Sequence, residues 1–86
     1  MTISDVKVTI RKGDQALDNA RMSIEKANAR LADASALAIA ALHDSERHEA
    51  RESRKALREA ADEVELVLRH ITAAKDHAAA YLATIG

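Results

Sequence analysis

The chain has 86 residues, of which 13 are basic and 14 acidic, so its net charge is −1. Apolar residues make up 48% of it; 20 residues are Ala, one is aromatic, two are Gly, and Pro, Cys, Trp and Phe are absent. This composition favours helix over a β-sandwich, a barrel or an enzyme built on Gly-rich loops, and it excludes disulfides and Cys-based zinc sites. The length predicts a single domain, residues 1–86.

Charge and hydropathy give no sign of a nucleic-acid or membrane partner. Residues 1–43 hold six basic and five acidic groups, and residues 44–86 hold seven and nine, so neither half is a basic module. No apolar run is long enough to span a membrane, and no apolar segment of a signal peptide follows Met1. We therefore expect a cytoplasmic protein, with export that does not use a cleavable signal peptide as the alternative.

The N-terminal segment carries conflicting signals. Residues 6–11 alternate apolar and polar side chains like a strand, and Gly13 disfavours helix by about 1 kcal/mol relative to Ala. However, Ile3, Val6 and Ile10 keep a helical repeat, and no other segment offers a partner strand. We predict helix from about residue 4, with a loose arm before Gly13 as the alternative.

A seven-residue repeat then organises the rest of the chain. Large aliphatic residues recur every seven positions in the first half and are each followed, three positions later, by a small one. The second half has the same repeat. This periodicity is typical of long amphipathic helices in coiled coils. The main rows are Ile3, Ile10, Leu17, Ile24, Leu31 and Ala38, and Ala50, Leu57, Val64, Ile71, Ala78 and Ile85; the small rows are Val6, Gly13, Ala20, Ala27, Ala34 and Ala41, and Ser53, Ala60, Val67, Ala74 and Tyr81.

The two repeats match each other if the chain folds back at its middle. Ala38 then faces Ala50 and Ile24 faces Val64. All other pairs of the main rows require the same position of the turn. Asp44 and Ser45 are residue types that cap a second helix. The sequence predicts an all-α antiparallel hairpin with helix one at about 4–43, a turn at about 43–46 and helix two at about 46–84. One bent helix, or two chains pairing as rods, are the alternatives.

Apolar side chains outside this seam predict a second interface. Residues 36–42 are apolar on every side, so Leu37, Ile39 and Leu42 are expected to point outward, together with Met22 and Leu66 farther along the helices. Exposed apolar stripes commonly mark association. We predict a homodimer that forms a four-helix bundle through these residues. A helix of another protein in the same groove is the alternative.

The polar residues suggest little chemistry. Arg47, Arg51, Arg54 and Arg58 form a stripe that could bind an anionic partner, but neighbouring Glu residues favour a solvated, ion-paired surface. The four His residues do not occur in the Glu-x-x-His pattern of di-iron bundles, and no catalytic fingerprint is present. We expect no catalytic residues, no metal and no cofactor.

The chain resembles small uncharacterised Ala-rich helical proteins of actinobacteria. The resemblance covers most of the chain and is carried by Gly13, the polar turn and the ending Tyr81-Leu82-Ala83-Thr84-Ile85-Gly86. In layout these are similar to the helical hairpins of type VII secretion, which implies a dimeric export partner or adaptor. The Trp-x-Gly turn and the Tyr-x-x-x-Asp/Glu signal of those hairpins are absent, because the turn here is His43-Asp44-Ser45 and Ile85 follows Tyr81 at four positions.

These features together predict a non-enzymatic structural or adaptor protein that acts through helix–helix contacts. The alternatives are a secretion-associated hairpin and a small regulator that binds nucleic acid through the Arg stripe.

Overall fold

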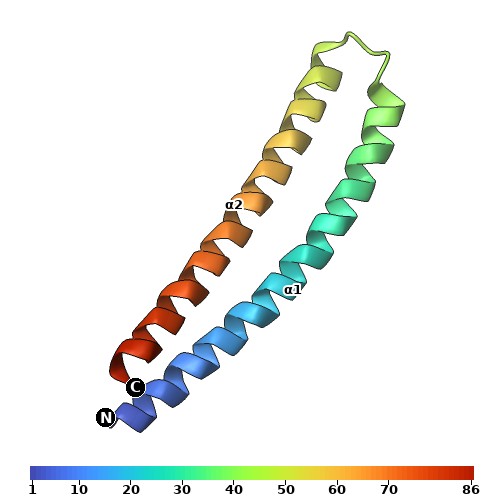
Figure 1. Ribbon diagram of the computed structural model, residues 1–86. Coiled ribbons are helices and arrows are strands. Elements are labelled where there is room, and N and C mark those ends of the chain that lie inside the picture. Colours follow the sequence, from blue (N-terminus) through green and yellow to red (C-terminus); the bar gives the residue numbers. More distant parts are fainter.

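The computed structural model describes residues 1–86 as two long helices joined by a short loop (Figure 1). α1 is Ile3–Leu42, of 40 residues, and α2 is His48–Ile85, of 38 residues. The helices run antiparallel, so both chain ends lie at one end of the rod, here called the foot, and the loop forms the other end, the tip. The rod measures 62 × 17 × 16 Å. The predicted all-α antiparallel hairpin is confirmed, and the single bent helix is excluded.

Helix α1 begins at the N-terminus with a capping box. The Thr2 hydroxyl accepts a hydrogen bond from the Asp5 backbone N–H at 3.1 Å, and the Asp5 carboxylate accepts one from the Thr2 N–H at 3.1 Å. These two bonds satisfy backbone donors that the first helical turn leaves free. The helix runs without interruption through Gly13, which has no positive φ. The strand-like alternation of residues 6–11 is therefore overridden by a good cap and by the absence of a partner strand.

The tip ends α1 without Gly or any residue of positive φ. The Leu42 carbonyl accepts hydrogen bonds from the Ser45 N–H at 3.0 Å and from the Arg54 guanidinium of α2 at 2.7 Å. The expectation that Asp44 or Ser45 caps the second helix is wrong, because the N-cap is Arg47 and it makes no side-chain capping bond. The loop needs more residues to cross from one helix to the other, so α2 begins later than predicted.

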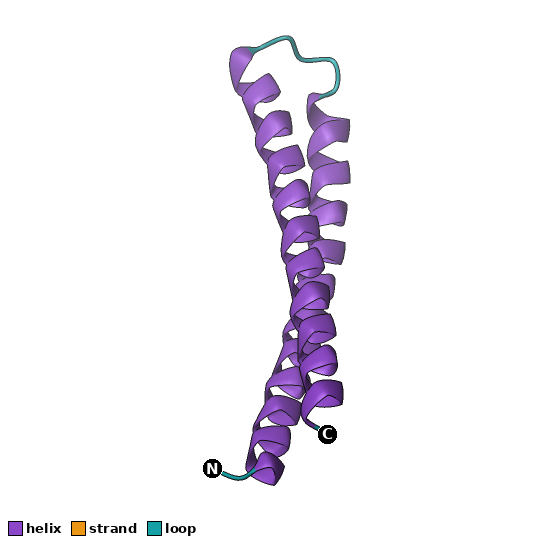
Figure 2. Ribbon diagram, turned by 60° about the vertical axis from the view of Figure 1, so that its left-hand side comes forward, coloured by secondary structure: helices purple, strands orange, loops and turns teal.

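The helices meet along the predicted main rows and cross each other along their length (Figure 2). Ile24 and Val64 line one groove, as their predicted pairing requires. Only Ala50 and Ile71 are buried, at 4% and 8% exposed, and both belong to the main row of α2. Most of the other main-row residues are half-buried. A two-helix hairpin thus has a seam rather than an enclosed core.

Most residues of the small rows are exposed, and only Val6, Ala20 and Ala60 are half-buried. Ala27, Ala34 and Ala41 are exposed, whereas residues one position later in the repeat, such as Asp14 and Asn28, are half-buried. With two helices, only the main row meets its counterpart directly, and the two flanking rows lie about 50° to either side of it. Long polar side chains in a flanking row can extend over the seam and cover it, whereas an Ala side chain is too short to do so.

Candidate interaction surfaces

The flanking rows give the hairpin two unlike faces. Because the helices are antiparallel, the small rows of both helices lie on one side of the seam, and the rows that follow them by one residue lie on the other. Contacts support this geometry, since Ala27 and Ala60 line one groove and Asp14 and Lys75 form an ion pair. The Ala face consists of Val6, Gly13, Ala20, Ala27, Ala34 and Ala41 with Ser53, Ala60, Val67, Ala74 and Tyr81; the polar face consists of Lys7, Asp14, Arg21, Asn28, Ser35 and Leu42 with Arg54, Ala61, Leu68, Lys75 and Leu82.

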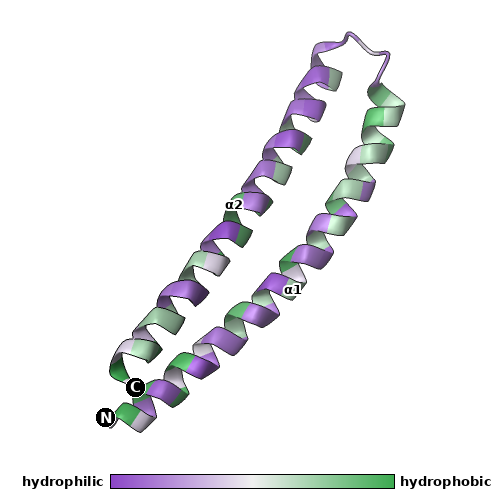
Figure 3. Cartoon of the chain, viewed as in Figure 1, coloured by the Kyte–Doolittle hydropathy of each residue, from purple (hydrophilic) through white to green (hydrophobic).

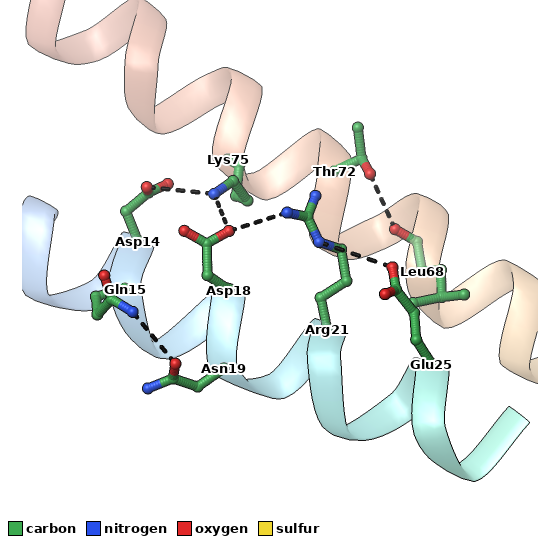
Figure 4. A network of polar contacts seen from close by, with 9 residues as sticks. All are labelled: Asp14, Gln15, Asp18, Asn19, Arg21, Glu25, Leu68, Thr72 and Lys75. Carbon is green, nitrogen blue, oxygen red and sulfur yellow. Dashed lines mark hydrogen bonds and ion pairs between the residues drawn. The ribbon is translucent and has the colours of Figure 1, made fainter. Parts of the chain in front are cut away.

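The polar face holds the ion pairs that join the two helices (Figure 4). The Lys75 ammonium donates hydrogen bonds to the carboxylates of Asp14, at 3.3 Å, and Asp18. Within α1, Arg21 extends this network by pairing with Asp18 at 3.2 Å and with Glu25 at 4.0 Å. Every other ion pair lies within one helix or at the tip. Lys75 is only 21% exposed and therefore fixes one level of the hairpin register.

This network changes the protonation of two of its members. The hydrogen bond from Lys75 lowers the pKa of Asp18 below its ordinary value of 3.8, helped by the charges of Lys75 and Arg21. The hydrogen bond to Asp18 raises the pKa of Lys75 above 10.5, helped by Asp14. The Asp18 contribution to stability is thus fully present above pH 3.8 and is lost as pH falls through the lowered pKa. The Lys75 contribution is fully present below pH 10.5 and is lost as pH rises through the raised pKa.

We expect Lys75→Met to lower the urea midpoint of unfolding at pH 7, and to lower it less at acidic pH. The variant removes the α2 cation that pairs with two α1 carboxylates but keeps an unbranched side chain, and as pH falls through the lowered pKa of Asp18 this carboxylate loses the charge that attracts Lys75 in the wild type. Urea titrations followed by circular dichroism at pH 7 and below pH 3 measure both midpoints. Lys55→Met is the control, because Lys55 only meets exposed Glu59 at 4.0 Å on its own helix. An equal loss at both pH values would contradict the ion-pair explanation.

The Ala face is open to solvent. Its middle is a shallow groove lined by Ile24, Ala27, Ala60, Val64 and Val67, with Glu63 at its edge. Val67 and Tyr81 are exposed large side chains on the same face. The groove has an apolar floor made partly of the seam itself, so a helix lying on it would cover the side of the seam that no part of this chain covers.

The structure places the five predicted interface residues on different sides of the rod. Leu37 is 74% exposed and Ile39 43%, and Met22 and Leu66 are exposed as well. Leu42 is half-buried at the tip. By their positions in the repeat, Leu37 borders the Ala face, Ile39 borders the polar face, and Met22 and Leu66 lie on the outer sides of their helices. One flat partner surface therefore cannot contact all five.

The predicted Arg stripe is partly engaged within the chain. Arg54 donates hydrogen bonds to the carbonyls of Leu42 and Ser45, and Arg51 lies 3.8 Å from the Glu46 carboxylate. Arg47 occupies the N-cap position of α2. Arg51, Arg54 and Arg58 line one shallow depression with Glu52 and Lys55. Of the four stripe members, Arg58 in this depression makes no hydrogen bond or ion pair, and Arg54 belongs to the tip structure.

Sequence reasoning missed Asp14, Asp18 and Lys75 as a set. The available signal was two carboxylates four residues apart on one helix face, with Lys75 opposite them in the predicted register. No group of three or more His, Asp or Glu side chains is arranged to hold a metal ion. Neither helix has the length of apolar sequence that a membrane crossing requires.

Comparisons of the chain with protein families, with curated proteins and with solved structures found no match.

Proposed function

We propose that this chain is a non-enzymatic interaction protein whose hairpin works by packing against further helices, and that two copies associate into a four-helix bundle. The observation that carries the proposal is the shortage of buried surface. Two of 86 residues are buried, although nearly every residue is ordered in a helix. Ordering each residue costs about 1.5 kcal/mol of conformational entropy, which apolar burial has to offset.

The exposed apolar side chains support the same proposal. Nine large hydrophobic residues are exposed along the rod, including Leu37 and Ile39 near the tip. Figure 3 shows this end of α1 in green while the facing start of α2 is mostly purple, and Leu37 and Ile39 remain exposed beside it. Soluble monomers seldom leave a large contiguous apolar area exposed, and such areas commonly serve association.

Sedimentation equilibrium tests the proposal directly. We expect a mass of twice 9.3 kDa at high protein concentration. Changing Leu37 and Ile39 together to Glu should weaken this association while circular dichroism still shows helix, because both side chains are exposed and their loss removes little intrachain packing. A double variant that associates as tightly as the parent would remove these residues from the interface. A wild-type chain that stays monomeric at every concentration would refute dimerisation.

A further inference from the structure

We infer that the surface used in association is the Ala face, and that its partner is a second copy of this chain, related by a two-fold axis along the rod so that α1 of one copy lies over α2 of the other. This inference rests on the proposed function and adds to it the face and the orientation. Three observations carry it: the surface area of the rod, the contrast between its two faces, and the distribution of charge beside the Ala face.

The surface area indicates how much is left to bury. The hairpin exposes 6504 Å². A compact monomer of its mass would expose about 5,000 Å², so the rod has an excess of about 1,500 Å². A stable interface of standard size removes about 800 Å² from each partner, and obligate dimers remove more. The excess therefore matches a partner that runs along the length of the rod. A second copy of the chain is a rod of the same length.

The contrast between faces decides which side is covered. The polar face is crossed by Lys75, which pairs with Asp14 and Asp18, and Arg21 pairs with Asp18 beside it, so covering this face would remove water from four charged groups that are already paired. The Ala face would instead bury the floor of the groove formed by Ile24, Val64 and Val67. Its small side chains let helices approach to the close end of the usual 8–10 Å. Gly13 adds room on the same face, since a Cβ there meets nothing within 4 Å.

Charges beside the Ala face select a second copy in one orientation. In the two rows that border this face, α1 carries Lys12, Lys26 and Arg30 with Asp5 and Asp33, whereas α2 carries Glu49, Glu52, Glu59 and Glu63 and no Lys or Arg. The α1 side is therefore slightly positive and the α2 side strongly negative. Placing α1 over the partner's α2 brings Lys26 level with Glu63 and Arg30 level with Glu59. Placing α2 over the partner's α2 would bring like charges together, which costs free energy.

A pair of single substitutions tests the face. Leu37→Glu introduces a charge at the border of the Ala face, and Ile39→Glu introduces the same charge beside the polar face. We expect Leu37→Glu to raise the dimer Kd by about tenfold or more, and Ile39→Glu to leave it within about twofold. Sedimentation equilibrium gives both values, and circular dichroism verifies that each variant remains helical. An equal effect of both substitutions, or a larger effect of Ile39→Glu, would overturn the face assignment.

Thiol labelling gives a readout that does not depend on weakening the dimer. The chain has no Cys, so Ala27→Cys places a single thiol on the Ala face, and Ala32→Cys places one beside the polar face. Both positions are exposed in the hairpin. We expect the alkylation rate of the thiol at position 27 to fall about tenfold as protein concentration rises, while the thiol at position 32 reacts at a constant rate. Equal rates at a concentration where the chain is dimeric would overturn the face and leave the proposed association standing.

Charge exchange tests the partner and its orientation. One variant carries Lys26→Glu and Arg30→Glu, a second carries Glu59→Lys and Glu63→Lys, and a third carries all four changes. Each of the first two should self-associate more weakly than the wild type, and the third should recover, because α1 and α2 then exchange their charges across the interface. Arg11→Glu with Arg58→Glu, both beside the polar face, is the control. If the variant with all four changes does not regain the self-association of the wild type, the orientation is overturned. A monomeric wild type would refute the proposed function together with this inference.

Discussion

Replacing Ile71 by Ala is expected to lower the free energy of unfolding by about 2 kcal/mol, the low end of the range for buried Ile to Ala changes. Ile71 is one of the two buried residues and lies in the main row of α2. The value is at the low end because the seam is open on both sides, so water and neighbouring side chains partly refill the space. In a protein with this little buried surface, the loss removes a large share of its stability. Urea unfolding followed by circular dichroism measures it.

Ile3→Ala is the matched control for this change. It removes the same atoms from the same main repeat, but Ile3 is 60% exposed at the foot. We expect it to cost only a few tenths of a kcal/mol, as for most surface substitutions. If both variants unfold at the same urea concentration, the burial of Ile71 does not describe the seam in solution.

Replacing Arg54 by Ala should lower the free energy of unfolding by about 1.5 kcal/mol, because its guanidinium donates hydrogen bonds to two backbone carbonyls at the tip. One of these is the Leu42 carbonyl, at the end of α1. No Gly in a left-handed conformation closes this helix, so Arg54 takes over part of the work of a C-cap. Arg54→Lys should recover less than half of the loss, since an ammonium lacks the planar fork that reaches both acceptors.

Arg58→Ala separates this structural role from a role in binding. Arg58 lies four residues later in the same stripe and makes no hydrogen bond or ion pair, so its removal should leave the urea midpoint nearly unchanged. Equal destabilisation by the two Ala variants would contradict the tip geometry. If neither variant changed stability but both abolished binding of an anionic probe, the stripe would be a binding surface instead.

The seven-residue spacing of the main rows was enough to predict the fold, its antiparallel direction and the pairing of Ile24 with Val64. It was not enough to predict which of the two rows that flank the main row, the small row or the row one residue after it, is more buried. Hydropathy favours Ala34 over Asn28 for the inner position, yet the two rows are equivalent by symmetry about the seam. Side-chain length breaks this symmetry, because Lys75 can span the gap to α1 and no Ala side chain can. This interaction joins residues 57 and 61 positions apart, so no local pattern reports it.

The predicted start of α2, at about residue 46, is too early for a related reason, because the helix begins at His48. Asp44 and Ser45 are good caps by residue type, and local preference therefore put the helix start beside them. The chain must first cross from one helix to the other, and Arg54 donates hydrogen bonds to Leu42 at the end of α1 and to Ser45 in the loop. A side chain twelve residues from Leu42 thus decides where the tip ends, and the capping preference is overruled.

The placement of both chain ends at the foot has a mechanical consequence. Tension applied through the two ends pulls directly on the layer nearest the foot, where Ile3 and Ile85 end the seam. The layers then carry the load one after another, so the hairpin should peel apart gradually and at low force. Tension applied between the tip and one chain end would instead run along a single helix, so the backbone hydrogen bonds of that helix, and not the seam, would carry the load. The same rod is therefore compliant when it is pulled by its two chain ends and stiff when it is pulled between foot and tip.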